Sequence, residues 1–331
     1  MRLRRAERHE PRGTPQRHDA GSDKKDKKDK KDTKRRATAA AHDSGGRQMK
    51  RSTLFEARRR AAALGPTLAM TLAMTLAAAQ ASMPAYAQSP PSNTADDANK
   101  SNNPLNLAAS LNVQNMFAPS LYGSSAVTND LLLRGTLPIG PNGLVPVPQI
   151  LRLTAPVSTR PDPSGDYNTG LGDINLFDIF LVSQGATQIG IGPLVTAPTA
   201  TDPTLGTGKW QAGLAAVVVN ASRARLVGAL VQWQHSFAGQ SGRPTVQSLT
   251  AQPFGIFNLP GGWYIRSTGI WTFDLQHGAW YIPVGLGGGK AWKAGGTIYN
   301  VFVEPQYSVA HSGAGVPKWQ IFAGLNMTFG K

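Results

Sequence analysis

The sequence predicts an all-β protein, an antiparallel transmembrane β-barrel of about twelve strands that follows a signal peptide and a disordered basic extension. From Leu105 onward, apolar and polar residues alternate in segments of about ten residues, which are separated by turn residues. The connections between these segments alternate in length. No stretch after residue 87 approaches the roughly 18 to 20 unbroken apolar residues that a membrane helix needs.

Charge is unevenly distributed along the 331 residues, which contain 34 Lys and Arg against 19 Asp and Glu. Residues 1–87 hold 21 of the basic and 9 of the acidic residues, so 13 and 10 remain for the other 244. The positive excess therefore belongs to the leader and does not indicate that the folded part binds nucleic acid. The absence of cysteine excludes disulfides and thiolate metal sites and fits an oxidising compartment.

Residues 1–48 are expected to form a disordered basic extension. They contain a Lys-Lys-Asp repeat from Lys24 to Asp32 and too few apolar residues to build a core. A tail that binds nucleic acid is the alternative interpretation of this run. Because Met49 begins a signal peptide that is complete without the upstream residues, Met49 is the alternative translation start to Met1.

Residues 49–87 have the organisation of an export signal. A basic region at 49–60 precedes an apolar run at 66–81. Ala85-Tyr86-Ala87 then offers the small-x-small pattern of a cleavage site before Gln88. The alternative, a short buried helix, does not account for this order of charge, apolar run and small residues.

The export signal and the predicted membrane strands together predict where the protein is located. We expect residues 88–104 to be a flexible N-terminus of the mature chain and residues 105–331 to be the barrel. Closed barrels of this kind span the outer membrane of Gram-negative bacteria. The expected partners are therefore outer-membrane lipid and lipopolysaccharide, periplasmic chaperones and the barrel-assembly machinery.

The last two segments show the alternation most clearly. In the final one, the two faces carry Trp319, Ile321, Ala323, Leu325, Met327 and Phe329, and Gln320, Phe322, Gly324, Asn326 and Thr328. In the segment before it, they carry Tyr299, Val301, Val303, Tyr307 and Val309, and Asn300, Glu304, Gln306 and Ser308. The first face suits lipid and the second a lumen, because a carboxylate is costly in hydrocarbon.

Further segments of the same kind precede these two. They span residues 109–117, 129–138, 147–156, 173–183, 187–197, 209–219, 224–237, 246–258, 262–273 and 279–293. Single-chain bacterial barrels have an even number of strands, so about twelve are expected, with about ten or fourteen as the alternatives.

Connection length tests the prediction independently, because a barrel with both termini in the periplasm has short inner turns and longer outer loops. The proposed turns are 140–143, 184–186, 220–223, 259–261 and 294–296. The proposed loops are 119–128, 158–172, 198–208, 238–244 and 311–317, with a short one at 275–278.

Tryptophans recur near the ends of the predicted strands. They are Trp210, Trp233, Trp263, Trp271, Trp280, Trp292 and Trp319. Their positions fit aromatic belts at the two membrane interfaces, and packing in the core of a protein surrounded by water is the alternative.

A series of short motifs resembles a known family. The motifs are Thr169-Gly-Leu-Gly-Asp-Ile174, Gly192-Pro193, Ala197-Pro-Thr-Ala-Thr-Asp202, Leu205-Gly-Thr-Gly-Lys-Trp210, Gln252-Pro-Phe254, Gly262-Trp-Tyr264 and Trp280-Tyr-Ile-Pro283 with Gly285 to Lys290. Their order resembles bacterial outer-membrane barrel proteins labelled neuromedin U-like or "transporter", which are related to the phenol meta-pathway (MetA-type) family. The resemblance covers residues 103–329 and implies an outer-membrane barrel, with small aromatic or apolar compounds as solutes by association. One departure is that Gly330 and Lys331 follow Phe329, whereas many such strands end on an aromatic residue.

Three groups of residues invite a site but have simpler explanations. Gly285 to Lys290 lacks the first Gly and the final Ser or Thr of a phosphate-binding loop, so close packing is expected there. The pairs His235-Ser236 and His311-Ser312 could serve a lipid-hydrolysing barrel enzyme, but adjacent strand residues point to opposite faces. Calcium could bind loop carboxylates, although solvated charges are favoured at Asp162, Asp166, Asp173 and Asp202. We predict no catalytic residues, no metal site and no cofactor.

One connected polar set is expected to face the lumen. It consists of Arg134, Arg152, Asp178, Gln232, Gln234, Arg266, Glu304 and Gln306. These groups either bridge one another and seal the lumen or line a pore that favours solutes of one charge. Replacing Glu304 with Gln should alter ion preference in a pore and destabilise a sealed barrel.

The sequence thus predicts a passive outer-membrane channel or uptake protein rather than an enzyme. The small-molecule solute is unknown, and no nucleic acid is expected as a partner. The alternative is a closed structural or surface-display barrel that transports nothing. The short, polar outer loops favour transport, because a display protein tends to carry long, adhesive ones.

Overall fold

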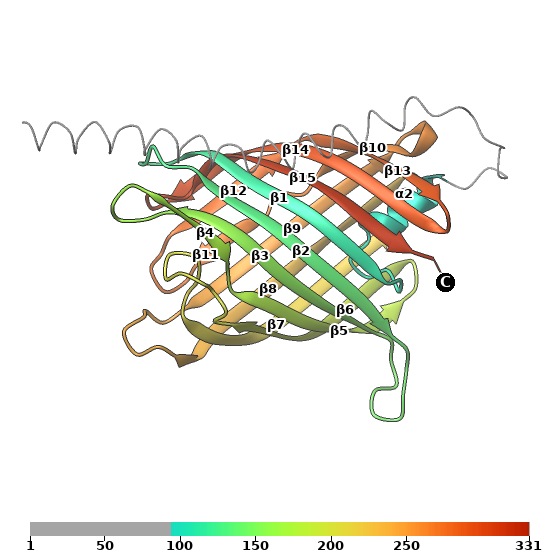
Figure 1. The fold of residues 1–331 in the computed structure, drawn as a ribbon. Coiled ribbons are helices and arrows are strands. Elements are labelled where there is room, and N and C mark those ends of the chain that lie inside the picture. Colours follow the sequence, from blue (N-terminus) through green and yellow to red (C-terminus); the bar gives the residue numbers. More distant parts are fainter. Residues whose placement is uncertain (1–93, 331) are drawn as a thin grey trace, which may run out of the picture. The chain divides into compact units, whose positions relative to one another are not determined.

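The computed structural model describes residues 94–330, which form a closed antiparallel β-barrel preceded by a short helix (Figure 1). The elements are α2 (Thr94–Asn102), β1 (Ser110–Leu121), β2 (Thr128–Ile139), β3 (Gln149–Pro161), β4 (Tyr167–Leu171), β5 (Ile174–Gln184), β6 (Thr187–Ala197), β7 (Lys209–Ala221), β8 (Arg225–Gly239), β9 (Gln247–Asn258), η1 (Pro260–Gly262), β10 (Trp263–Ser267), β11 (Trp271–Asp274), β12 (Trp280–Gly285), β13 (Gly287–Ala294), β14 (Thr297–Ser312) and β15 (Pro317–Phe329). Within this range no helix is long and apolar enough to cross a membrane. The predicted extension, signal peptide and cleavage point at Ala87 and Gln88 lie outside the described residues.

The fifteen strands make twelve spans, because three spans are interrupted once each. β4 and β5 both pair with β3, β10 and β11 both pair with β9, and β12 and β13 both pair with β14. All neighbours are antiparallel, and β1 pairs with β15 to close the ring. Closure leaves no free sheet edge, which is the condition for a sheet in a bilayer. The predicted fold class and the expected number of spans are confirmed.

The spans are connected alternately at two ends of the barrel. The turn end carries the connections 140–148, 185–186, 222–224, 259–262 and 295–296. The loop end carries 122–127, 162–166, 198–208, 240–246, 275–279 and 313–316. Most turns lie where the sequence predicted them, and the connection 140–148 is longer than predicted.

The stretch 158–172, predicted to be one long loop, is mostly strand. β3 continues to Pro161 and β4 starts at Tyr167, and the two strands pair in register. Only residues 162–166 turn, and Asp162 supports the turn by accepting backbone N–H bonds from Ser164 and Asp166. The prediction was wrong because Pro, Gly, Ser and Asp dominate this stretch, while backbone pairing in a hairpin requires no apolar alternation.

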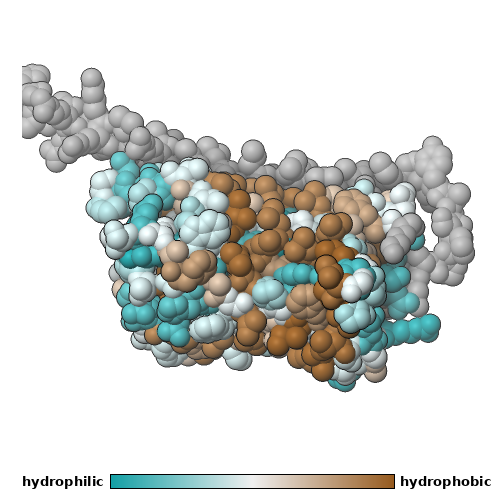
Figure 2. Space-filling model, turned by 90° about the horizontal axis from the view of Figure 1, so that it is seen from below, coloured by the Kyte–Doolittle hydropathy of each residue, from teal (hydrophilic) through white to brown (hydrophobic). Residues whose placement is uncertain are grey.

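The outward face of the wall is apolar around its middle. Large exposed side chains on it include Leu137, Ile191, Leu214, Val231, Val284 and Val303. Figure 2 shows an apolar band over the middle of the barrel, with more polar surface towards both ends. A protein surrounded by water rarely exposes so large an apolar surface, whereas a barrel that spans a bilayer requires one.

The interior at the turn end is also apolar. Inward side chains from several strands pack around Ala98 and Leu105 of the N-terminal segment, and they include Ile150, Ile179, Leu181, Val219, Leu226 and Ile298. Helix α2 contacts β8, β13, β14 and β15 from within the ring. This part of the barrel is therefore filled by a core.

Residues 94–102 correct part of the prediction that 88–104 is a flexible terminus, and residues 88–93 lie outside the described range. Asp96 and Asp97 lie in the first turn of α2 and Lys100 in its last, an arrangement that favours a helix through its dipole. Asn99 donates from Nδ2 to the carbonyl oxygen of Ser222 at 2.7 Å, which ties the helix to a turn of the barrel. A nine-residue polar helix is marginal alone, so these contacts decide its formation.

Candidate functional site

The lumen contains a cavity of about 290 Å³. This volume is close to the lower end of small-molecule pockets, which hold roughly 300 to 1,000 Å³. Inward side chains of β1, β2, β3, β5, β8, β9, β10 and β15 form its wall, and residues 100–104, 106 and 108 bound it from the N-terminal segment. Polar residues in the lining include Asn112, Gln114, Arg134, Arg152, Gln232 and Gln252.

Arg134 and Arg152 project into this cavity from neighbouring strands. Arg152 pairs with Thr136, two residues along β2 from Arg134, so the two arginines are diagonal neighbours on one face of the wall. Arg134 donates from Nη1 to Oε1 of Gln114 at 2.7 Å. Arg152 donates from Nε to Oγ1 of Thr136 at 3.0 Å, and its guanidinium lies 5.2 Å from the ring centroid of Phe177. Both guanidinium groups are therefore held towards the lumen.

Positive charge exceeds negative charge around the cavity. Lys100, Arg134, Arg152 and Arg266 line it, and no Asp or Glu among residues 94–330 does. Of these cations only Arg266 forms an ion pair with a described carboxylate, that of Glu304. The cavity therefore carries positive charge without a counter-charge in the described part of the chain.

The wall across the lumen from the two arginines has a different character. In a ring of twelve spans, β2 lies opposite β9, and β3 lies opposite the span made by β10 and β11. Phe254 and Ile256 of β9 and Ile270 between β10 and β11 line the cavity there. The same wall also carries the polar residues Thr250, Gln252, Arg266 and Thr268, so the apolar residues form a patch within it.

Glu304 lies in a closed hydrogen-bond cluster at the wall. Its Oε2 accepts from Nε of Arg266 at 2.8 Å and from Oγ1 of Thr268 at 2.7 Å. Its Oε1 accepts from the backbone N–H of Thr268 at 2.7 Å and from Nε2 of Gln306 at 3.0 Å. The Glu304 side chain is fully buried, and Arg266 also lies over the Phe302 ring at 3.7 Å. The cluster explains the break between β10 and β11, since the N–H of Thr268 donates to Glu304.

The glycines of the apparent phosphate loop serve close packing. A Cβ on Gly285 or Gly287 would collide with Glu304, and one on Gly289 would collide with the ring of Tyr264. Tyr264 pairs with Gly289 across β10 and β13, and its hydroxyl donates to Oδ1 of Asn300. The expectation that these glycines allow close approach inside a barrel is confirmed.

Seven of the eight lumen candidates point inward, in different roles. Arg134, Arg152, Gln232 and Arg266 line the cavity, and Gln234 accepts a hydrogen bond from Thr196 at 2.9 Å. Glu304 and Gln306 are buried in the wall cluster.

Asp178 is the exception and corrects the prediction. It lies between Phe177 and Ile179, whose side chains are buried inside the barrel, so the alternation of the strand turns Asp178 outward. The prediction assumed that polar residues face inward along every strand. In β5 the rule fails because the turn end of the interior is an apolar core.

The residues that hold the cavity's arginines and form its base were not among the predicted lumen residues. Gln114 bridges Arg134 and Asn326, and the carbonyl oxygen of Pro104 accepts from Arg152 at 3.5 Å. Gln114 shares one face of the predicted strand 109–117 with Ser110 and Asn112, which was a usable signal. No signal in the sequence placed residues 94–104 inside the ring, because their polar composition is also that of an exposed terminus.

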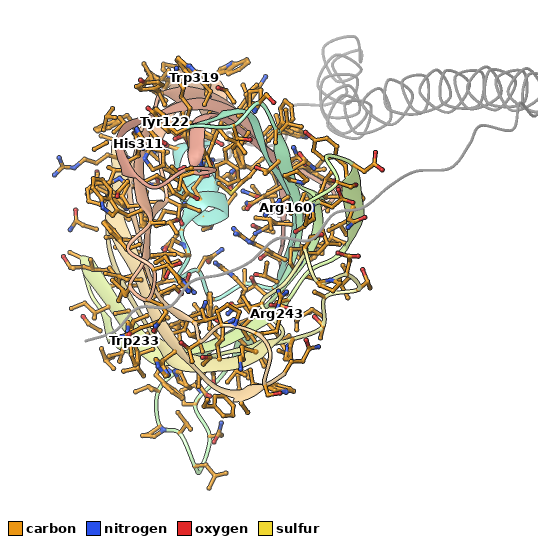
Figure 3. The ribbon with its side chains drawn as sticks, turned by 90° about the vertical axis from the view of Figure 1, so that its left-hand side faces the viewer. Tyr122, Arg160, Trp233, Arg243, His311 and Trp319 are labelled. Atoms are coloured by element: carbon orange, nitrogen blue, oxygen red, sulfur yellow. The ribbon has the colours of Figure 1, made fainter. Side chains whose placement is uncertain are left out.

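The loop end brings together motifs that carried the family resemblance. Asp173, between β4 and β5, accepts from the N–H and Oγ1 of Thr207 at 2.7 and 2.8 Å. Arg243 donates from Nε to the carbonyl oxygen of Thr207 at 3.0 Å. Figure 3, viewed from the loop end, shows Arg160 and Arg243 inside the ring of strands. The loop 198–208 is thus anchored to both of its neighbours.

Asp202 organises that loop internally. It accepts from the backbone N–H of Thr204 at 2.8 Å and from the Thr204 hydroxyl at 2.7 Å. These hydrogen bonds hold the pKa of Asp202 below its ordinary value. Among the described residues, no group of three or more His, Asp or Glu could hold a metal ion.

The His-Ser pairs lie apart from the cavity. His235 is exposed on the outer face, while Ser236 is buried and its Oγ accepts from the N–H of Val246 at 2.9 Å. The ring of His311 stacks on Tyr122, with 3.4 Å between centroids (Figure 3). Neither histidine is hydrogen-bonded to its neighbouring serine in the described part of the chain, so neither pair has the geometry of a base and its nucleophile.

The tryptophans divide between the two ends. Trp210, Trp280 and Trp319 lie near the loop end of their strands, and Trp263 and Trp292 lie near the turn end. Trp233 and Trp271 lie further from the loop end, six residues before the end of β8 and three residues before the end of β11. The first five positions fit two interfacial belts.

No protein-family model matches the sequence, and no curated protein matches it. Among solved structures, the barrel is similar to an outer membrane channel from Pseudomonas putida F1, with 15% identity and a TM-score of 0.52 over 68% of this chain and 96% of that one. The outer membrane phospholipase of Salmonella typhi has 14% identity and a TM-score of 0.34, over 72% and 99% of the two chains. The β domain of the Bordetella autotransporter BrkA has 16% identity and a TM-score of 0.37, over 67% and 100%. The fold is thus that of an outer-membrane β-barrel, and the resemblance carried by the motifs is supported to that extent.

Proposed function

We propose that the protein is a passive channel or uptake protein of a Gram-negative outer membrane, which admits a small solute through the barrel lumen. The observation that carries this proposal is the cavity of about 290 Å³, whose polar lining includes cations without a described counter-charge. A barrel that only supported surface loops would gain stability from filling this space. The similarity to a structure described as an outer membrane channel also supports the proposal.

The orientation and partners follow from the same proposal. The loop end faces the outside and the turn end the periplasm, as in bacterial barrels with short periplasmic turns. Lipid, lipopolysaccharide and the assembly machinery are the partners of such a barrel. The resemblance to the phenol meta-pathway family supports small aromatic or apolar compounds as solutes. No catalysis is proposed, because the His-Ser pairs lack the required geometry.

A closed structural barrel is the second candidate, and two observations favour it. The charges of Arg266 and Glu304 neutralise each other within their cluster, and the core around Leu105 fills the turn end. In this alternative the cavity is an internal space without transport, and the loops carry the function.

Single-channel conductance of refolded Gln88 to Lys331 in a planar bilayer separates the two. Discrete openings that a small solute blocks are expected for the uptake protein. A barrel that folds, as shown by its heat-modifiable migration on a gel, yet never conducts would favour the structural alternative. A refolded, unrelated membrane barrel of known conductance serves as the control for insertion.

A further inference from the structure

We propose that Arg134 and Arg152 form an anion site in the lumen, which binds the carboxylate group of a small organic acid. The inference rests on the proposed function, since a site in the lumen meets solutes that enter it, and it names their chemical class. Several N–H donors of the two guanidinium groups have no acceptor among the described residues.

The two arginines have more donors than described acceptors. Two guanidinium groups together carry about ten N–H donors. Among residues 94–330, Arg134 uses one of them on Gln114, and Arg152 uses one on Thr136 and one on the carbonyl oxygen of Pro104. Every one of these acceptors is neutral. The remaining donors can reach a ligand in the cavity that both residues line.

Arg266 differs from these two arginines because its guanidinium is paired with a carboxylate within the protein. Its Nε donates to Glu304 at 2.8 Å, its Nη2 donates to Thr268 at 2.7 Å, and its guanidinium stacks on Phe302. A carboxylate, a hydroxyl and an aromatic ring thus satisfy one guanidinium. Arg134 and Arg152 lack the carboxylate within the described chain, although they are diagonal neighbours on one face of the wall. A bound anion supplies the missing partner.

The arrangement of the donors favours a carboxylate. Diagonal neighbours on adjacent strands lie roughly 7 to 8 Å apart, so two long side chains can converge on one anion between them. Planar guanidinium groups match the two oxygens of a carboxylate in a bidentate pair. Two such groups beside one cavity form a site for a single negatively charged group.

The opposite wall favours an organic acid over an inorganic ion. Phe254, Ile256 and Ile270 form an apolar patch in the wall across from the two arginines, where the one cation, Arg266, is already paired with Glu304. A ligand with a carboxylate at one end and an apolar body at the other can contact both walls, and it removes apolar surface from water. An inorganic anion contacts the two arginines alone and leaves the apolar patch in contact with water.

Calorimetric titration of the refolded mature protein in detergent tests the site with benzoate, benzamide and sulfate as probes. Benzoate should bind at least tenfold more tightly than benzamide, which has the same ring without the charge. It should also bind more tightly than sulfate, which has the charge without the ring. Equal binding of benzoate and benzamide would overturn the anion site, and sulfate binding as tightly as benzoate would overturn the organic acid.

Variants assign the binding to the two residues. Arg134→Gln combined with Arg152→Gln should weaken benzoate binding at least tenfold. The matched control is Arg223→Gln combined with Arg225→Gln, which removes the same charge from exposed positions near the turn end and should leave binding unchanged. Unchanged binding in the first double variant would contradict the assignment. If that variant does not refold, the three probes on the natural sequence still decide the proposal.

Conductance distinguishes this inference from the proposed function. Titration requires a folded barrel but no conduction. A barrel that binds benzoate and never conducts would retain the anion site and lose the channel. A barrel that conducts, binds no benzoate and has no anion preference in its reversal potential would retain the channel and lose the site.

Discussion

At the scale of single residues, the lumen wall contains two kinds of arginine, one that is buried and two that are only partly buried. The Arg266 guanidinium has a carboxylate partner, and Glu304 accepts four hydrogen bonds in return. The guanidinium groups of Arg134 and Arg152 have neutral described partners and face open space. Changing Glu304 therefore tests the structure of the wall, whereas changing Arg134 or Arg152 tests what the cavity binds.

Glu304→Gln should destabilise the barrel. The change leaves the Arg266 guanidinium buried without its counter-charge, and breaking such a pair costs about 3 to 5 kcal/mol. The measurement is the free energy of unfolding from urea titration in lipid vesicles. Asp130→Asn is the matched control, because its ion pair with Arg160 is about 30% exposed on each side and should cost about 1 kcal/mol or less. Unchanged stability with an altered reversal potential would instead place Glu304 in a permeation path.

At the scale of elements, the loop 198–208 and helix α2 are the segments whose positions depend on particular hydrogen bonds. Asp202 holds the loop through Thr204, and Asp173 holds it through Thr207. Asn258 donates a hydrogen bond to Asn99 of α2, and Asn300 donates one to Asn102, the last residue of α2. Both segments border the lumen or its entrance, so their stability bears on access to the cavity.

Acid should loosen the loop 198–208. The pKa of Asp202 is lowered in the folded loop by its hydrogen bonds to Thr204, so its contribution to stability is present above the ordinary value of 3.8. That contribution is lost as the pH falls through the lower, folded value. Cleavage by an acid-active protease, mapped by mass spectrometry, should therefore rise in this loop below about pH 4. Asp202→Asn should be cleaved there by a neutral protease at pH 7, and resistance of that variant would contradict the role of the carboxylate.

Removal of α2 should open the turn end. Deleting residues 94–102 removes Ala98 from the apolar core and the bond from Asn99 to Ser222. Single-channel conductance should rise several-fold, since the segment occupies the interior of the ring. Shortening the exposed connection 140–148 is the control and should leave conductance unchanged. A deletion without effect would show that the lumen is closed elsewhere.

At the scale of the whole molecule, the barrel inverts the usual distribution of polarity over its middle. The exposed band is apolar, while Gln114, Asn300, Glu304 and Gln306 are buried within. This arrangement is stable in a bilayer, where the outward face meets hydrocarbon and the closed ring satisfies every backbone group.

A charge in the outer band should be costly only in a bilayer. Leu214 lies near the middle of β7 and is 55% exposed, so Leu214→Arg should destabilise the barrel in lipid by about 2 to 4 kcal/mol. Leu144→Arg, in the connection 140–148 where Leu144 is 95% exposed, should cost little. Folding titrations in vesicles compare the two variants. Equal stability of both would contradict a membrane position for the band.

The regular part of the fold could be predicted because strand alternation is a local property. The polar residues Asn300, Glu304 and Gln306 of β14 and Gln320 and Asn326 of β15 take the inward face that their parity indicates. The errors have two causes, and the first is that burial inside the ring depends on distant residues. Asp178 points outward because Phe177 and Ile179 join a core with Leu105, some seventy residues earlier in the chain. The hairpin of β3 and β4 was missed because its pairing needs no apolar pattern.

The sequence by itself determined the class of this protein. Its alternation, turn residues and distribution of charge are sufficient for an antiparallel barrel of twelve spans. Every strand of a closed sheet has the same alternation of outward and inward residues, so the pattern can be recognised one strand at a time. Only the tertiary structure decided what the ring contains. It placed α2 inside the turn end, paired Arg266 with Glu304, and left Arg134 and Arg152 facing an apolar patch of the wall across the lumen. Those outcomes depend on which strands lie opposite one another, and closure of the ring sets that relation between residues far apart in the chain.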